Sequence, residues 1–172
     1  MNRRKKNLSP ELAEQVRSDH LTAIAAFSRL AQHRRNRLLP YLHLRTFAAD
    51  ETIYEQGDPP AAIFFLHSGS VNLFHLEGAS RRDRIRVASA GESLGHAALL
   101  PAAPQLESAI AAEPVKLLVL LRADFDTLKI KEPILATAIL QGVLEEVLEN
   151  ACLAFTAYRG LTNQLTAANI IV

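Results

Sequence analysis

The stretch FAADETIYEQGDPPAAIFFLHSGSVNLF, from Phe47 to Phe74, decides the fold of this chain of 172 residues. Short segments rich in β-branched and aromatic residues alternate in it with the turn sequences QGDPP, Gln56 to Pro60, and Ser68-Gly69. Strand segments that recur at intervals of about ten residues between such turns are typical of a small sandwich or barrel. The stretch therefore predicts an antiparallel β-roll rather than a parallel sheet.

The same pattern continues on both sides of this stretch and covers residues 45 to 121. Further turns are expected at Glu77-Gly78, Ala90-Gly91 and Glu113-Pro114. The expected strands are Arg45 to Phe47, Thr52 to Glu55, Ala62 to His67, Ser70 to His75, Asp83 to Ala88, Ser108 to Ala112 and Val115 to Leu121. We therefore expect a jelly-roll-like antiparallel roll of about seven to eight strands, and helices on either side of it make the fold class α+β.

The segment before the roll, residues 9 to 44, is expected to be helical. Ser9 suits an N-cap, Pro10 the first helical position and Glu11 the first turn. Apolar residues then recur at helical spacing, among them Leu21, Ile24, Ala25, Phe27 and Leu30. Residues 1 to 8 are expected to form a basic, flexible tail.

The segment after the roll, residues 122 to 172, is expected to form a short helix over Asp124 to Lys129 and a long helix from about Pro133. A break near Gly160 is expected, because glycine costs roughly 1 kcal/mol relative to alanine inside a helix. Spacings of four and three alternate along the long helix and define an apolar seam. The seam residues are Leu140, Leu144, Val147, Ala151, Ala154, Tyr158, Leu161 and Leu165. The seam would join two copies in a homodimer or bind a helix of a partner protein; the alternative is that it covers the chain's own roll.

The composition, with 49% hydrophobic and 22% charged residues, is that of one ordinary globular domain. The single cysteine, Cys152, cannot form an internal disulfide and is expected to be a small core residue. No apolar run approaches the roughly 18 residues of a membrane span. We therefore expect a cytoplasmic protein with no membrane span.

Charge is distributed unevenly along the chain. Residues 1 to 45 hold ten Lys and Arg against three Asp and Glu, a net charge of +7, whereas residues 46 to 172 hold nine against fifteen, a net charge of −6. A basic region of this kind attracts nucleic acid, anionic lipid or an acidic partner. The alternative is a solvated tail and a charged helix face that pair with the acidic remainder of the chain.

The order of helices, β-roll and long C-terminal helix resembles the cyclic-nucleotide-binding domain, the effector domain of catabolite-activator-type regulators and protein kinase regulatory subunits. Glu51-Thr52-Ile53, Gln56-Gly57-Asp58 and Ser68-Gly69 match the first half of that domain, and Val87 to Leu120 is similar to its phosphate-binding cassette and the strands around it. The resemblance covers roughly residues 27 to 150. Only fourteen residues follow Tyr158, so we expect no helix-turn-helix domain and no direct sequence-specific DNA binding.

The cassette departs from the family at the two side chains that would hold the ligand. The resemblance implies an Arg that neutralises the cyclic phosphate and a Glu that takes the ribose 2′-hydroxyl, beside a turn whose backbone N–H groups converge on the phosphate. Gly95 keeps the turn, but His96 stands at the Glu position and Gln105 at the Arg position of an ungapped alignment. A short gap would move the Arg position to Leu106 or Glu107, and neither restores the charge. Losing both contacts would weaken nucleotide binding by roughly three orders of magnitude.

Other residues could compensate for this loss. Arg82, Arg84 and Arg86 would share one strand face by period two, and His96 could bind an anion when protonated. The candidate ligand-binding residues are therefore Gly95, His96, Ala97, Gln105, Ser108 and Arg86, for cAMP, cGMP or another anionic effector. The alternative is that the arginines lie on the solvent face and that His96 is a hydrogen-bonded turn residue. The sequence by itself establishes no cofactor.

Catalysis is not indicated. The six histidines show neither H-x-H nor H-x-x-x-H spacing, so no metal site is expected, and no nucleophile has an adjacent base. Two hypotheses of different class remain. The chain is a sensor that binds an anionic effector and signals through its C-terminal helix, or it is a regulatory interaction module that keeps the fold with a degenerate pocket. His96 and Gln105 favour the second hypothesis, and the retained Gly95 turn keeps the first one open.

Overall fold

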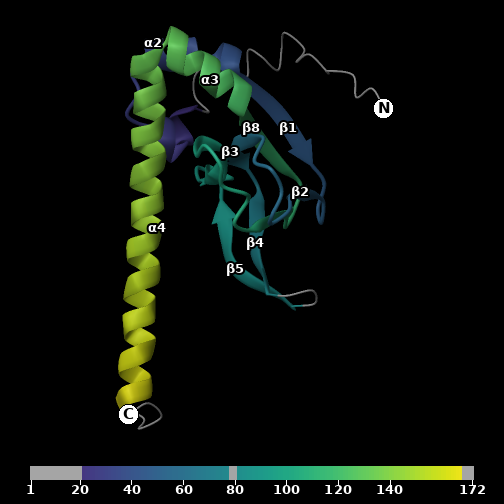
Figure 1. Ribbon diagram of the computed structural model, residues 1–172, viewed down its shortest axis with the longest axis vertical. Coiled ribbons are helices and arrows are strands. Elements are labelled where there is room, and N and C mark those ends of the chain that lie inside the picture. The colour runs from purple at the N-terminus through teal and green to yellow at the C-terminus, as the bar shows by residue number, and fades with distance from the viewer. Residues whose placement is uncertain (1–20, 78–80, 168–172) are drawn as a thin grey trace.

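The computed structural model describes residues 21–77 and 81–167. In this part of the chain eight strands form two four-stranded sheets, with order β1-β8-β3-β6 and β2-β7-β4-β5 (Figure 1). All strand pairs are antiparallel. The strands are β1 Leu42–Phe47, β2 Thr52–Tyr54, β3 Ala62–Ser68, β4 Ser70–Glu77, β5 Arg81–Ser89, β6 Ser93–Leu94, β7 Ser108–Ala111 and β8 Val115–Leu121. The predicted α+β fold with an antiparallel roll is confirmed.

The strands differ from the prediction mainly at their ends. β1 begins at Leu42, three residues earlier than predicted, because the whole strand pairs with β8, from Leu42 opposite Leu120 to Phe47 opposite Val115. The sequence pattern does not predict β6. This strand has two residues, paired with Phe64 and Phe65, and two residues are too few to show a period.

The segment before the roll is helical, but it is broken into short pieces. η1 Leu21–Ala23 and η2 Ala25–Phe27 are single 3₁₀ turns, followed by α2 Gln32–Leu38 and a third 3₁₀ turn, η3 Leu39–Tyr41. No continuous helix spans the first two turns, because Ile24 between them is extended and the Ala25 N–H donates to the Gly91 carbonyl at 2.9 Å. A tertiary hydrogen bond has replaced an intrahelical one. The predicted helix start at Ser9 and the predicted tail over residues 1 to 8 lie outside the described residues.

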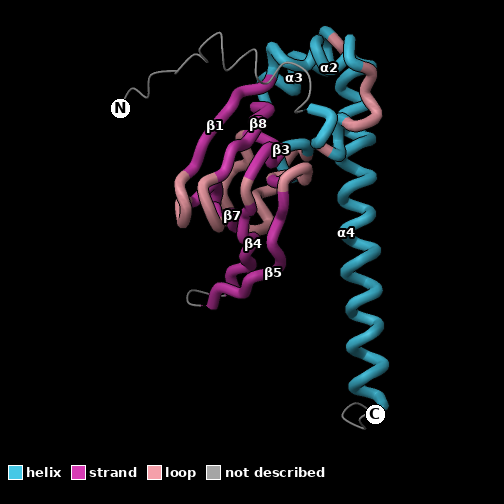
Figure 2. The backbone as a smooth tube through the Cα atoms, turned by 180° about the vertical axis from the view of Figure 1, so that it is seen from behind, coloured by secondary structure: helices cyan, strands magenta, loops and turns pink. Residues whose placement is uncertain are grey.

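Two helices follow the roll, α3 Arg122–Lys131 and α4 Pro133–Ala167. α4 runs without interruption through Gly160, so the predicted break there is wrong. Figures 1 and 2 show α4 along one side of the roll, with its C-terminal part extending beyond the lower edge of the sheets. Among the described helices, none has the length and apolar character that crossing a bilayer requires.

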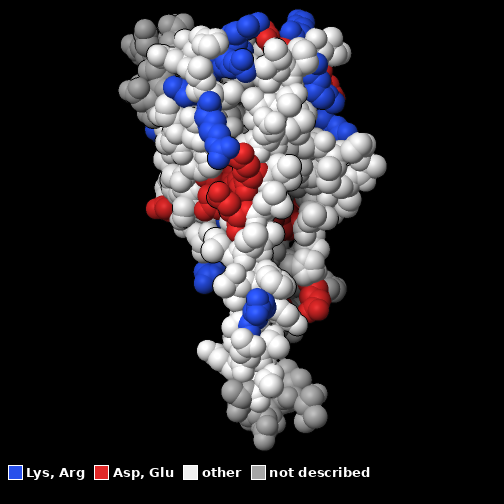
Figure 3. All heavy atoms as spheres, turned by 90° about the vertical axis from the view of Figure 1, so that its left-hand side faces the viewer, with Lys and Arg blue, Asp and Glu red and all other residues white. Residues whose placement is uncertain are grey.

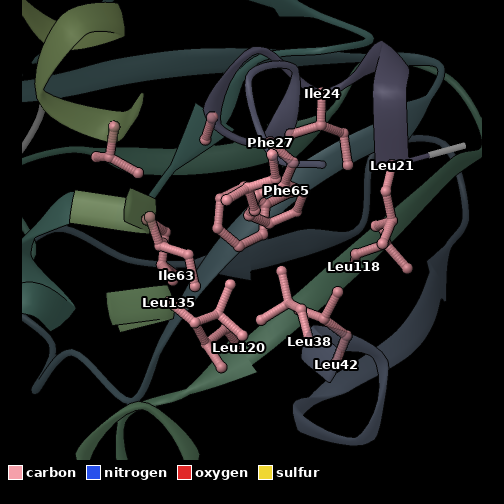
Figure 4. Packing of buried hydrophobic residues seen from close by; sticks show 14 of the residues in the cluster. Leu21, Ile24, Phe27, Leu38, Leu42, Ile63, Phe65, Leu118, Leu120 and Leu135 are labelled. Atoms are coloured by element: carbon pink, nitrogen blue, oxygen red, sulfur yellow. The ribbon is translucent and has the colours of Figure 1, made fainter. Parts of the chain in front are cut away.

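Two apolar clusters hold the roll and the helices together. The first joins β3 and β8 to the N-terminal turns and to α3 and α4, and its Phe27 and Phe65 rings lie 4.4 Å apart (Figure 4). The second fills the space between the sheets, where Leu66, Leu73 and Leu117 are at most 1% exposed. Each such side chain contributes about 1.5–3 kcal/mol on burial. The helices are therefore part of the same folded unit as the roll.

α4 packs on the rest of the molecule through residues 133 to 146. Leu135, Ala136, Ile139 and Val143 are all buried on this side. At Gly142 the helix lies against η2 so closely that an added Cβ would stand 2.4 Å from the carbonyl oxygen of Ala26. No side chain larger than hydrogen fits at such a backbone contact, so Gly142 sets the distance between α4 and η2.

Alanine at the two helical glycines is expected to have opposite effects. Gly142→Ala forces α4 away from Ala26 and should lower the free energy of unfolding by about 1–3 kcal/mol, the usual cost of overpacking. Gly160→Ala meets nothing within 4 Å and should stabilise the helix by up to about 1 kcal/mol. Urea denaturation followed by circular dichroism measures both. Stabilisation by both variants would contradict the close contact at Gly142.

Candidate functional site

The cassette, residues 95 to 108, begins at a backbone position that requires glycine. Gly95 has a φ of 71°, in the left-handed region, and an added Cβ would lie 3.1 Å from both the Ala62 carbonyl oxygen and the Phe64 ring. The short 3₁₀ helix η4, His96–Leu99, starts directly after it, with Ala97 and Ala98 buried. The predicted turn at Gly95 is therefore built from a positive φ followed by small residues that fit a crowded space.

Gln105 and Ser108 tie the cassette to the turn after β2. The Gln105 N–H donates to the Asp58 carbonyl at 2.9 Å, and its own carbonyl accepts from the Gly57 N–H at 2.8 Å. The Gln105 side chain is buried, and its Nε2 would lie 3.4 Å from a Cβ on Gly95. The Ser108 hydroxyl accepts a hydrogen bond from the Gln56 N–H at 3.0 Å. Both residues therefore hold the cassette in place through hydrogen bonds to the backbone of the turn after β2.

Glu107 contacts Tyr54 beside the Gly95 turn, and it was not among the predicted ligand-binding residues. The Tyr54 hydroxyl donates to Glu107 Oε1 at 3.1 Å, and the Tyr54 ring stacks on Phe64 at 5.5 Å. Burial raises the pKa of Glu107. Burial, and then the charge and hydrogen bond of Glu107, raise the pKa of Tyr54, against an opposing hydrogen bond from the backbone of Gly95. The tyrosine hydroxyl thus stands between a carboxyl group and the cassette turn.

Arg86 is close enough to act electrostatically on these groups, but Arg84 does not share its face. A bulge in the β4–β5 pairing places Arg86 opposite the buried Leu73 and Arg84 opposite Phe74. The extra residue, Ile85, reverses the alternation, so the prediction that Arg82, Arg84 and Arg86 lie on one face is wrong. Arg86 is half-buried and forms an ion pair with Glu92, and its charge opposes the rise that burial causes in the pKa values of Tyr54 and Glu107.

His96 is not suited to bind an anion at neutral pH. Its Nε2 lies 2.9 Å from the Ser93 hydroxyl oxygen. Burial, and then the positive charge of Arg86, lower the pKa of His96 to about 4. The imidazole is therefore neutral at pH 7 and adds no positive charge to the cassette.

Glu146 reaches the same network from α4 and was not among the predicted residues. The residue is 6% exposed, and its carboxylate accepts hydrogen bonds from the Ser93 N–H at 2.6 Å and from the Ser93 hydroxyl at 2.7 Å. Burial raises the pKa of Glu146, which the hydrogen bonds from Ser93 partly offset. Its spacing from Ile139 and Val143 places it on the buried helix face, but that face is known only once the packing of α4 is known.

The sequence also matches a described family over this region. Residues 44–131, about half of the chain, match the family model for the cyclic nucleotide-binding domain. The chain belongs to the cyclic nucleotide-binding domain family. The predicted family is confirmed, and the cassette described above lies within the matched residues.

Two relatives and one solved structure are similar to the chain. The chain is 33% identical over 139 residues to the cyclic AMP receptor protein of Thermus thermophilus, covering 77% of this chain and 63% of that protein. It is 26% identical over 110 residues to a cAMP-dependent protein kinase regulatory subunit of Colletotrichum orbiculare, covering 64% and 27%. The chain therefore spans less than two thirds of the length of either relative. A cyclic nucleotide-binding domain from Methylobacillus flagellatus superposes with a TM-score of 0.73 at 19% identity, covering 83% of this chain and 80% of that one, and supports the fold.

The predicted seam of this cyclic nucleotide-binding domain lies on an exposed face of α4. Leu140, Leu144, Val147 and Tyr158 are between 36% and 66% exposed, and Ala151 and Ala154 are exposed as well. The seam therefore does not cover the chain's own roll. Cys152 is exposed too, contrary to the expected core position, because α4 packs on the roll only as far as Glu146. Within residues 21–77 and 81–167, no group of three or more His, Cys, Asp or Glu side chains could hold a metal ion.

The free energy of unfolding is expected to fall on acidification because of His96. A folded-state pKa of about 4 against about 6.5 in the unfolded chain means that the unfolded state binds the proton first. Stability is then complete above pH 6.5 and is lost, at up to roughly 1.4 kcal/mol per pH unit, as the pH falls towards 4. His96→Gln should flatten the profile measured by denaturant titration between pH 7 and 5. The exposed His33→Gln is the control, and equal profiles for wild type and His96→Gln would contradict the assignment.

Proposed function

We propose that this chain is a non-enzymatic regulatory module that keeps the cyclic nucleotide-binding fold, fills its ligand site with its own side chains, and acts by self-association through α4. The observation that carries the proposal is the Tyr54–Glu107 pair beside Gly95. A tyrosine hydroxyl and a carboxyl group occupy the side of the cassette where a cyclic phosphate would need a cation. The module is assigned to the cytoplasm, with no direct DNA contact.

The charges around the cassette oppose a cyclic phosphate. Two like charges 4 Å apart repel by about 4 kcal/mol at an effective dielectric constant of 20, so an ionised Glu107 disfavours a bound phosphate. A neutral Glu107 avoids the repulsion but supplies no positive charge. His96 is neutral at pH 7, and Arg86 is paired with Glu92. A nucleotide would therefore have to break an ion pair and displace Tyr54 before it gained a cationic partner.

One observation favours the alternative, a working sensor for an anionic effector. Arg86 lies on the inner face of β5 and its charge acts on Tyr54, His96, Glu107 and Glu146. An anion able to take Arg86 from Glu92 would gain a half-buried guanidinium. Such an effector would need to contact Glu107 through a hydrogen-bond donor, because a carboxyl group next to its charged end would otherwise repel it.

Wild-type protein is expected to show no change of melting temperature with millimolar cAMP or cGMP, whereas His96→Glu with Glu107→Arg should show one. The double variant supplies a carboxylate at position 96 and, at position 107, the guanidinium that the gapped alignment places there. It should give a shift of roughly 5 to 10 °C when the nucleotide is at a hundredfold its dissociation constant. Glu55→Arg, an exposed charge reversal outside the cassette, is the control. A wild-type shift that Arg86→Gln abolishes would replace the proposal with the sensor.

A second copy of the chain is the partner that α4 fits best. The alternating spacing of the seam is that of a coiled coil, and its residues are exposed. Arg159 is the one charged residue between positions 150 and 167, and the lower part of the face on which α4 lies carries few charges (Figure 3). Two copies can thus meet along the seam without facing like charges.

Leu144→Asp is expected to convert a dimer into a monomer, because it places a charge within the apolar seam. Light scattering coupled to size-exclusion chromatography should give twice the 18.9 kDa chain mass for wild type and a single chain mass for the variant. Thr156→Asp, on the opposite side of α4, should leave the dimer intact. A wild-type protein that is monomeric at every concentration would overturn the proposed self-association.

A further inference from the structure

The contact between Glu146 and Ser93 joins two parts of the molecule that lie far apart in the sequence. Glu146 belongs to α4, whereas Ser93 opens β6 next to the cassette. Ser93 is fully buried and donates both its backbone N–H and its hydroxyl to the two carboxylate oxygens. The same hydroxyl oxygen lies 2.9 Å from His96 Nε2. The three side chains therefore form one hydrogen-bonded unit across the boundary between helix and cassette.

This unit lies at the point where α4 leaves the roll. Before it, Ile139 and Val143 are buried against the rest of the chain. After it, every side chain from Val147 to Thr166 is at least partly exposed. Glu146 is thus the last buried contact of the helix.

A buried carboxylate makes this contact conditional on its partner. An acidic side chain out of water is costly unless hydrogen bonds replace its hydration, and Ser93 supplies two such bonds. Glu92 and Arg86 are the other charged groups that act on it. If α4 moved away from the cassette, Ser93 would lose an acceptor for its buried N–H, and Glu146 would regain water. The docked position therefore depends on a polar contact that can be exchanged for solvent, unlike the apolar contacts before it.

We infer that Glu146 is a built-in tether that holds α4 against the cassette through Ser93, so that the helix is docked without any bound effector. The tether rests on the proposed function in one respect, namely that the docked state needs no nucleotide. Glu146 acts through Ser93 and is a positioning residue. Removing its carboxyl group should release α4, and replacing it by an amide, which can still accept from the Ser93 N–H, should not.

Cys152 offers a direct measurement. It is the chain's one cysteine and is exposed on α4 just beyond the tether, so a spin label there can be paired with a second label at Lys116→Cys, exposed on β8. Pulsed dipolar spectroscopy on labelled protein diluted into unlabelled protein reports the distance between helix and roll within one chain. Without nucleotide, wild type should give one narrow distance distribution. Glu146→Ala should add a second, longer component, and Glu146→Gln should remain as narrow as wild type.

Glu149→Ala, which removes an exposed acid from the same helix, is the matched control and should leave the distribution unchanged. A Glu146→Ala distribution identical to that of wild type would overturn the tether and leave the docking to the apolar contacts alone. Where Glu146→Ala does not fold, Glu146→Leu replaces it, because leucine keeps most of the volume but offers no acceptor to the Ser93 N–H; the second component is again expected, and its absence is again decisive. A wild-type distribution that changes on adding cAMP would refute the proposed function, while the nucleotide-free comparison would still decide the tether.

Discussion

The approach of Gly142 to Ala26 is the constraint on which the arrangement of α4 depends. A Cβ added at Gly142 would stand only 2.4 Å from the Ala26 carbonyl oxygen. This close approach restricts both the direction and the rotation of α4. Val143 then follows on the buried side, and Glu146, one turn after Gly142, meets Ser93. The same rotation turns Leu140, Leu144 and Val147 towards solvent. A single close backbone contact thus separates a docked part of α4 from a part available to a partner.

The cassette shows that the fold and the ligand chemistry place separate demands on the sequence. The fold needs a left-handed Gly95 and the buried Ala97 and Ala98 behind it, since these satisfy backbone geometry and packing. Ligand binding needs charges at the ends of side chains, which packing does not require. A chain can therefore exchange the second set while retaining the first. The family match over residues 44–131 reflects the residues that the fold needs.

The features that the sequence predicts well are those encoded locally. Turn residues such as Ser68-Gly69 delimit the strands, and the positive φ at Gly95 follows from glycine at a turn. The features it does not predict depend on tertiary contacts. The bulge at Ile85 reverses the faces of Arg84 and Arg86, and a period-two count cannot detect an inserted residue. The sequence does not distinguish Glu146 from the other acidic residues of α4. Its burial depends on which side of the helix packs on the roll, and the close contact at Gly142 determines that side.

Arg86 connects the two halves of the site. Burial raises the pKa values of both Glu107, beside the cassette turn, and Glu146, on the helix, and the charge of Arg86 opposes both shifts. Arg86 also forms an ion pair with Glu92. An anion that captured this guanidinium would weaken its stabilisation of both carboxylates at once. Glu107 beside the cassette turn and Glu146 on α4 thus share Arg86 as an electrostatic partner. The two functional hypotheses thus differ at one contact. The proposed module requires that Arg86 stay paired with Glu92, whereas a sensor requires a ligand that separates this pair.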